Sequence, residues 1–196
     1  MAVAIFDLDR TLTRKGAFLP FAFYVLRRRP GRIVALPRIL ASAILLGFGL
    51  RHRDQVKALI WLKILSGLEH HEAEALATAF GREWARKALR PGAAAVLARH
   101  RSAGDRLVLA TAAMDLVAGP FGEALGFDEI VATRSRWTAA GGLAEGFDGP
   151  NCYGEEKLRR VQEVLGPDFE PADAAAYSDH VTDLPLLTWA ATGVAV

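Results

Sequence analysis

Short apolar runs alternate with longer helix-like stretches along most of this 196-residue chain, and this alternation limits the possible folds more than any other feature. The first run, Val-Ala-Ile-Phe at residues 3–6, is continuously apolar, which is typical of a strand buried on both faces of a sheet. Strands separated by helices form βαβ units around a parallel sheet. We therefore predict an α/β fold with strands at residues 3–6, 106–110, 129–132, 174–178 and 193–196.

Helices are predicted between these strands from their apolar periodicity and from their boundary residues. Pro91 suits the first turn of one helix, and Gly104 follows its end. The Ala-Ala-Gly-Gly segment at 139–142 predicts a β-hairpin that pairs residues 134–138 with residues 143–147. The predicted helices cover residues 71–89, 91–100, 114–125 and 155–165.

A long helical insertion follows the first strand. Residues 17–68 are apolar without the alternation of a strand, and Pro20, Pro30 and Pro37 are predicted to break them into separate helices. An insertion of this kind forms a second, smaller unit beside the Rossmann-like parallel sheet. The predicted domains are a catalytic core of residues 1–13 plus 88–196 and a helical cap of residues 14–87.

The most apolar stretch of the cap covers residues 33–50. Within it, the twelve residues 39–50 carry no charge, which is fewer than the roughly 20 that a membrane-spanning helix needs. We predict a helical hairpin here. Contact of this hairpin with a membrane surface is a further hypothesis, and a membrane-spanning helix is the less favoured alternative.

The formal net charge of +2 hides a strongly basic cap. Residues 10–68 contain twelve Lys and Arg and one acidic residue, whereas residues 69–196 contain twelve Lys and Arg and nineteen acidic residues. The densest cluster is Arg27, Arg28, Arg29 and Arg32. A solvated helix end explains this cluster about as well as an attraction to anionic lipid or to a substrate with more than one negative charge. Nucleic acid is not expected as a partner, because no readout module is visible.

The expected location of the protein is the cytoplasm, either free or peripheral at the inner face of the membrane. Cys152 is the single cysteine, so no internal disulfide and no multi-thiolate zinc site can form. The residues before the first predicted strand do not include the apolar segment of a secretory signal. The sequence does not indicate an oligomeric state.

Polar side chains gather where the predicted strands end. Asp7 and Asp9 follow the first strand, and Thr111 follows the second. Asp179 and Asp183 come after the strand at 174–178. Because the carboxyl ends of parallel strands meet at one edge of the sheet, we expect these side chains to lie together, with Lys157 at the start of a nearby helix.

Several converging carboxylates repel one another unless a hard cation lies between them, and oxygen ligands suit Mg²⁺. A lysine and a hydroxyl beside the cation can hold a phosphoryl group. One carboxylate can attack phosphorus, and a second carboxylate two residues further along an extended stretch points the same way and can transfer protons. The pattern therefore predicts phosphoryl-transfer chemistry.

Four segments resemble the motifs of the haloacid dehalogenase superfamily of aspartate-nucleophile phosphatases. The insertion after the first segment resembles the helical cap of the phosphoserine-phosphatase-like branch. The order and spacing of the segments cover nearly the whole chain. They are FDLDRTLT (6–13), LATAA (109–113), GEEKLRRV (154–161) and YSDHVTDLPLL (177–187).

The resemblance implies a role for each of the residues named above. Asp7 is implied to be the nucleophile and a Mg²⁺ ligand, and Asp9 the general acid and base that also offers its backbone carbonyl to the metal. Thr111 and Lys157 are implied to bind the phosphoryl group. Asp179 is implied to be a Mg²⁺ ligand, and Asp183 is implied to contact the metal through its outer shell or a bridging water.

Two features depart from the family pattern. Ser178 stands before Asp179, where many family members have glycine, and we expect this change to alter the loop without altering the chemistry. The sequence also stops near the predicted last strand, at residues 193–196, where family members continue. His180 and Cys152 are expected to be an exposed loop residue and a small buried residue without a catalytic role.

The resemblance implies a Mg²⁺-dependent phosphomonoester hydrolase with a small-molecule substrate. The first substrate hypothesis is a small phosphorylated metabolite, similar to phosphoserine or histidinol phosphate. The apolar, basic cap favours a lipid phosphate of the lysophosphatidate type as the alternative. A phosphotransferase or mutase, and a non-catalytic membrane-associated module on the same scaffold, are the rival classes of function.

Overall fold

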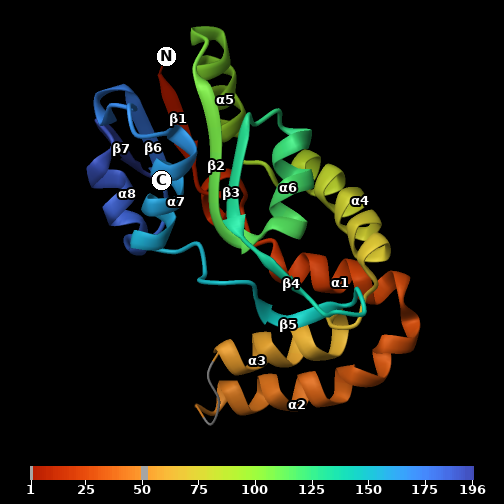
Figure 1. The fold of residues 1–196 in the computed structure, drawn as a ribbon. Helices are drawn as coiled ribbons and strands as arrows, with labels where there is room; N and C mark the ends of the chain where they lie inside the picture. Colours follow the sequence, from red (N-terminus) through yellow and green to blue (C-terminus); the bar gives the residue numbers. More distant parts are fainter. Residues whose placement is uncertain (1, 50–52) are drawn as a thin grey trace.

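The computed structural model describes residues 2–49 and 53–196. Met1 and Leu50, which belong to the predicted core and to the predicted apolar stretch, lie outside the described residues. Within the described residues, a five-stranded parallel sheet has the strand order β3-β2-β1-β6-β7 (Figure 1). Its strands are β1 (Val3–Phe6), β2 (Arg106–Met114), β3 (Glu129–Thr133), β6 (Ala174–Ser178) and β7 (Thr192–Ala195). The predicted α/β fold is confirmed.

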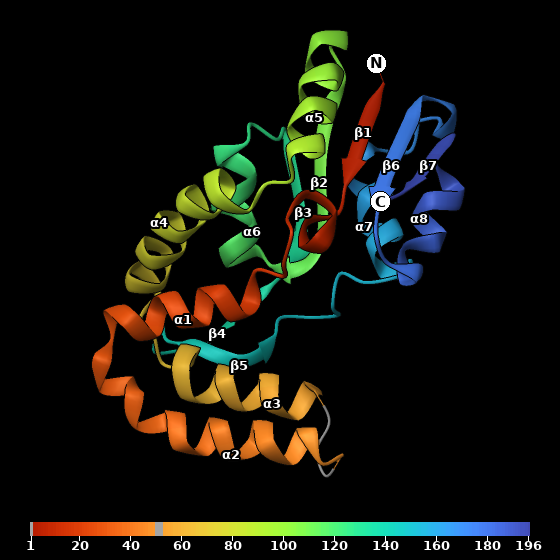
Figure 2. The ribbon, with the colours of Figure 1, turned by 180° about the vertical axis from the view of Figure 1, so that it is seen from behind.

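The central strand β1 is buried on both faces, which explains its continuous apolar sequence. Ala4 and Phe6 belong to one hydrophobic cluster, and Val3 and Ile5 belong to another on the opposite face. Helices cover both faces, as Figures 1 and 2 show. The first cluster includes side chains of α5 (Pro91–Ala103) and α6 (Asp115–Ala124), and the second includes side chains of α7 (Glu155–Leu165) and α8 (Leu184–Trp189).

Two details of the predicted elements are wrong. Strand β2 continues past residue 110 to Met114, because Thr111 pairs with Ala132 and Met114 pairs with Thr133 of β3 across a register shift. Thr111 therefore lies in the strand rather than after it. Pro20 does not break a helix, because it lies in the first turn of α1 (Phe18–Arg28), where a proline leaves no helical hydrogen bond unmade.

The inserted segment contains a helical hairpin, as predicted. Helices α2 (Leu36–Gly47) and α3 (Arg53–Ile60) lie side by side in both views (Figures 1 and 2). Pro37 lies in the first turn of α2, so it begins this helix. The remaining helical elements of the insertion are α1, the short helices η2 (Pro30–Ala35) and η3 (Trp61–Leu65), and α4 (His70–Ala88).

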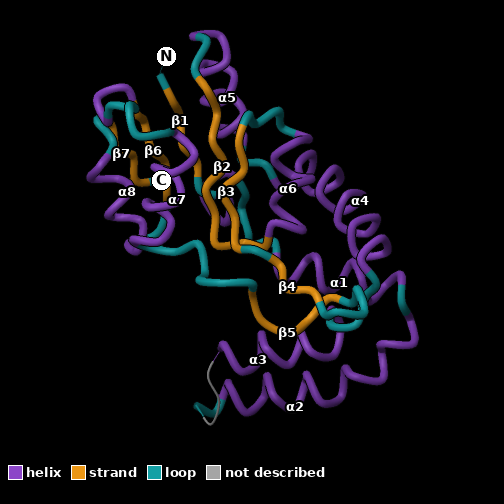
Figure 3. Tube along the Cα trace, viewed as in Figure 1, coloured by secondary structure: helices purple, strands orange, loops and turns teal. Residues whose placement is uncertain are grey.

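Within the described residues, α4 and the hairpin of β4 (Ser135–Trp137) and β5 (Leu143–Phe147) bring the predicted cap and the predicted core together. Helix α4 packs along α6 (Figure 1). The hairpin of β4 and β5 reaches out of the core to the helices of the insertion (Figure 3). There the Trp61 indole N–H donates a 2.7 Å hydrogen bond to the Ala144 carbonyl. These contacts hold the insertion over the carboxyl ends of the strands.

Candidate active site

A cavity of about 840 Å³ opens where the predicted site residues meet. Its walls come from the carboxyl ends of β1, β2 and β6, from the start of α7, and from α1, α3 and α4 of the insertion. All six residues predicted from the sequence line this cavity: Asp7, Asp9, Thr111, Lys157, Asp179 and Asp183.

Asp7 is held at the end of β1 by an irregular turn over residues 8–12 (η1, Leu8–Leu12). Leu8 and Leu12 are buried and anchor this turn in the core. Between them, Arg10 has φ +67°, a left-handed conformation that few residues other than glycine adopt. The backbone N–H of Asp7 donates to the Tyr177 carbonyl of the neighbouring strand at 3.0 Å. The carboxylate is therefore fixed in position at the floor of the cavity.

Lys157 connects two of the acids. Its ammonium lies 2.9 Å from Asp7 Oδ1 and 2.6 Å from Asp183 Oδ2, and only 2% of its surface is exposed. Burial alone lowers the pKa of Lys157, but the two carboxylates outweigh this effect and raise it above its usual value. The lysine is therefore a fixed positive charge beside the Asp7 carboxylate.

Thr11 and Ser178 position the acids. The sequence places Thr11 after the first strand beside Asp7 and Asp9, but it predicted no role in the site for either hydroxyl. Thr11 Oγ1 lies 3.3 Å from Asp7 Oδ2 and 3.1 Å from Asp179 Oδ1. It also accepts the backbone N–H of Asp179 at 2.9 Å. Ser178 Oγ donates to Asp183 Oδ2 at 2.6 Å. The serine that departs from the family pattern therefore binds one of the predicted metal-site acids directly.

Asp9 is oriented by the first residues of the insertion. Its Oδ1 accepts the Ala17 N–H at 2.9 Å. A Cβ at Gly16 would lie 3.2 Å from Asp9 Oδ2, so glycine leaves room for the carboxylate. Burial raises the pKa of Asp9 to about 6, although the Ala17 N–H opposes this shift. A carboxyl group with this pKa can donate and accept a proton near neutral pH.

Thr111 is buried, and its hydroxyl oxygen accepts the Ala113 N–H at 3.1 Å. This bond lies within the register shift of β2, so the irregular end of the strand fixes the hydroxyl at the cavity wall. A threonine hydroxyl that accepts one bond can still donate its own hydrogen to an oxygen atom.

The donor atoms at this site fit a hard divalent cation. Carboxylates of Asp7, Asp179 and Asp183 line one cavity, and Asp183 Oδ1 is buried without a hydrogen-bond partner among the described residues. An orphaned buried carboxylate oxygen is costly unless a cation or water satisfies it. Within residues 2–49 and 53–196, no three acidic, histidine or cysteine side chains lie close enough together to hold a metal ion by themselves. A site for Mg²⁺ would therefore combine side chains with backbone oxygen and water, as this ion prefers.

Several further cavity residues were not predicted as site residues. Arg10, Lys15 and Lys57 add positive charge to the walls, and Lys57 comes from α3 of the insertion. The excess of basic residues at 10–68 was the available sequence signal. His180 lines the cavity as well, with its Nδ1 2.7 Å from the Thr182 hydroxyl. The arrangement can bind a dianionic group between fixed cations and an aspartate.

The sequence is similar to a known protein family and to individual known proteins. The family model for haloacid dehalogenase-like hydrolases matches residues 4–188. Protein CicA of Caulobacter vibrioides is 37% identical over 182 residues, which cover 93% of this chain and 80% of that protein.

Two solved structures resemble the fold. A Bordetella pertussis protein of unknown function superposes with a TM-score of 0.73 at 28% identity, covering 95% of this chain and 85% of that one. A phosphoserine phosphohydrolase-like protein from Francisella tularensis superposes with a TM-score of 0.61 at 18% identity, covering 96% of this chain and 82% of that one. At this identity the second likeness concerns the fold alone.

Proposed function

Because the chain belongs to the haloacid dehalogenase-like hydrolase family, we propose that it is a Mg²⁺-dependent phosphomonoester hydrolase that acts through an aspartyl phosphate on Asp7. The observation that carries the proposal is the buried contact of Lys157 with Asp7 and Asp183, with Asp9 in the same cavity. This set supplies a nucleophile, a fixed cation and a proton-transfer group around one binding space.

Binding of the phosphoryl group relies on Lys157, Thr111 and the basic walls of the cavity. Burial raises the pKa of the Asp7 carboxyl above its usual value, and the ammonium of Lys157 opposes this shift. The same ammonium stabilises negative charge on the phosphoryl oxygens during transfer. Asp7, Asp179, Asp183 and the Asp9 carbonyl would hold Mg²⁺, which supplies charge neutralisation for the phosphoryl oxygens.

In the first step, an Asp7 carboxylate oxygen attacks phosphorus while the bond to the alcohol oxygen breaks. Asp9 in its protonated form donates a proton to the departing alkoxide, and its raised pKa supports this role. In the second step, ionised Asp9 takes a proton from water, which attacks phosphorus and releases inorganic phosphate from Asp7. The carboxyl group of Asp9 thus serves both steps in opposite protonation states.

The likeness of the four sequence segments and of the insertion to the phosphoserine-phosphatase-like branch supports a small phosphorylated metabolite as substrate. A second candidate, a lipid phosphate, is favoured by the apolar side chains that the insertion exposes, such as Phe23 and Leu40. Both candidates are phosphomonoesters, so the reaction proposed for the site is the same.

The test is phosphate release by the purified protein and by Asp7→Asn with Mg²⁺. This change keeps the size of the side chain and removes the attacking charge, so turnover should fall by about 10³-fold or more. EDTA should abolish the activity of the unchanged protein, and Mg²⁺ should restore it better than Ca²⁺. Asp168→Asn, at an exposed aspartate outside the cavity, is the matched control.

The proposal is wrong if Asp7→Asn retains a tenth of the activity or if full activity persists in chelator. A protein that releases no phosphate from any phosphomonoester would instead support the non-catalytic module.

A further inference from the structure

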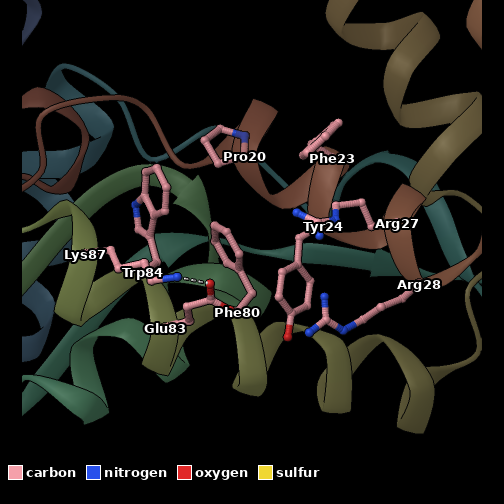
Figure 4. Close-up of a pocket in the computed structure, with 9 residues that line it drawn as sticks. All are labelled: Pro20, Phe23, Tyr24, Arg27, Arg28, Phe80, Glu83, Trp84 and Lys87. Atoms are coloured by element: carbon pink, nitrogen blue, oxygen red, sulfur yellow. Dashed lines mark hydrogen bonds and ion pairs between the residues drawn. The ribbon is translucent and has the colours of Figure 1, made fainter.

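A groove between α1 and α4 adjoins the active-site cavity. Its volume is about 410 Å³. Figure 4 shows the side chains that line it. Pro20, Phe23 and Trp84 line both this groove and the cavity that holds Asp7. A molecule held in the cavity can therefore extend over these three side chains into the groove. The predicted phosphoryl-binding residues do not use this second space.

The floor of the groove is aromatic. The ring centroids of Tyr24 and Phe80 are 5.5 Å apart, and those of Phe80 and Trp84 are 5.4 Å apart. Tyr24 and Phe80 are buried, so this part of the floor is fixed by packing. Phe23 is 60% exposed and rises beside the floor (Figure 4). A polar, compact leaving group would gain nothing from these side chains, whereas an apolar chain would be removed from water by them.

Arg27 and Arg28 give one end of the groove a positive charge. The Arg28 guanidinium lies 3.5 Å from the centroid of the Tyr24 ring, and that of Arg27 lies 5.9 Å from the Phe23 ring. Glu83 binds Lys87 at 2.7 Å. Among the described residues that line the groove, Glu83 is the one acid, so the two arginines leave the groove with net positive charge. This charge attracts an anion to the end of the groove that is formed by Arg27 and Arg28.

The distance from the cavity to the arginine end of the groove sets the length of a molecule that would reach both. Pro20 lies at the cavity, and Arg28 is eight residues further along α1. At a helical rise of 1.5 Å per residue, this separation is about 12 Å.

We propose that the groove binds the leaving group of the substrate, and that the substrate is a phosphomonoester whose alcohol carries an apolar chain ending in a second anionic group. The inference rests on the phosphatase activity proposed above. The phosphoryl group would lie at Asp7, the chain over Phe23, Phe80 and Trp84, and the second anion at Arg27 and Arg28. A phosphomonoester of this class is longer and less polar than phosphoserine.

The test compares kcat/KM for three soluble phosphomonoesters with Mg²⁺. Glycerol phosphate has a short polar leaving group, decyl phosphate adds the apolar chain, and carboxydecyl phosphate adds the terminal carboxylate. We expect decyl phosphate to exceed glycerol phosphate by about 10-fold, and carboxydecyl phosphate to exceed decyl phosphate by a further factor of about five.

Two variants separate the features. Phe23→Ala should lower the ratio of kcat/KM for decyl phosphate over glycerol phosphate by about threefold or more, because the chain loses an apolar wall. The double change Arg27→Gln and Arg28→Gln should remove the advantage of the carboxylate and keep that of the chain. Phe48→Ala and Arg86→Gln, which are exposed and outside the groove, are the matched controls and should keep both ratios.

Equal kcat/KM for the three substrates, or ratios that the groove variants do not change, would overturn the inference and leave the phosphatase proposal intact. Absence of phosphate release from all three substrates would overturn the proposed function, and the inference would fall with it.

Discussion

The strand ends of the core bury polar side chains and pair them, whereas helix α2 of the insertion exposes apolar side chains. At the strand ends, the buried Lys157 binds two carboxylates, and the buried hydroxyl of Ser178 donates to Asp183. In α2 the one buried residue is Ser42, whose hydroxyl has no partner among the described residues. Its apolar side chains are instead exposed, with Leu40 at 62%, Ile44 at 52% and Phe48 at 76%.

This difference shows that the strand ends of the core depend on specific side-chain partners, whereas the exposed face of α2 does not. At the strand ends, Lys157 and Ser178 pair with carboxylates because an unpaired buried polar group costs free energy, and Asp183 Oδ1 is the buried oxygen left for a cation. Leu36, Leu40, Ile44 and Phe48 are spaced by four residues and form an exposed apolar stripe along α2. Such a stripe contributes little to the free energy of unfolding, and an exposed apolar patch of this kind is typical of a surface that contacts a membrane or a partner.

The largest effect is expected from breaking the paired charges of the core. Lys157→Met would leave Asp7 and Asp183 buried without their cation, and it would remove the positive charge beside the proposed nucleophile. We expect activity to fall by about 10³-fold and the free energy of unfolding to fall by about 3 kcal/mol. Phosphate release and urea denaturation measure the two effects. Lys63→Met, which changes a lysine outside the cavity, is the control, and equal losses in both variants would contradict the assignment.

Contact of the insertion with an anionic membrane stays a prediction, and the structure changes which residues would carry it. Arg32 donates to the carbonyls of Ile64 and Ser66, and Arg29 binds Glu72, so these two arginines are engaged within the molecule. The span Pro30–Gly47 has a mean hydropathy of 1.4 with 11% of it buried, and by length and composition alone it could cross a membrane. That signal is weak, because it appears also in core helices and signal sequences.

Binding to lipid vesicles tests this contact, and Arg27 and Arg28 are the arginines of the cluster left to carry it. Arg27 and Arg28 contribute about 2 kcal/mol at about 1 kcal/mol each, which is about 30-fold in partitioning. We expect co-sedimentation with anionic but not neutral vesicles, weakened by salt and by Leu40→Glu with Ile44→Glu. The matched control is Glu substitution of two exposed polar residues outside the stripe, Gln162 and Thr188. Absence of binding at low salt would contradict the prediction.

A smaller effect tests the positioning role of Ser178. Ser178→Ala removes the hydrogen bond to Asp183 and leaves Lys157 as the described partner of that carboxylate. We expect kcat to fall by about tenfold and the free energy of unfolding to fall by about 1 kcal/mol. Ser102→Ala, at an exposed serine of α5, should change neither. A Ser178→Ala variant with unchanged kcat would show that the serine affects only the loop, as first expected from the sequence.

The sequence was sufficient for the sheet and for the convergence of the site residues. Strands buried on both faces are continuously apolar, and carboxyl ends of parallel strands meet at one edge, so Asp7, Thr111 and Asp179 could be placed together in advance. The end of β2 could not be placed, because the small residues at 111–113 signal neither a strand nor a helix.

The sequence was insufficient where a role depends on a partner that is distant in the chain. Thr11 contacts Asp179 across 168 residues, and Lys57 reaches the cavity only because α3 lies over the strand ends. Arg32 appeared as part of a free basic cluster, but its guanidinium binds carbonyls at the end of η3. Periodicity and motif spacing contain no information about such pairings.

The smallest effect on the free energy of unfolding is expected from a change on the exposed stripe of α2. Leu40→Gln replaces an exposed apolar side chain by a polar one of similar helix propensity, so the free energy of unfolding should change by less than about 0.5 kcal/mol. Leu109→Ala, at a fully buried position of β2, should cost about 2–5 kcal/mol in the same urea titration. If Leu40→Gln costs as much as the core change, the stripe is covered in the folded protein, and its exposure cannot be the basis of contact with a membrane.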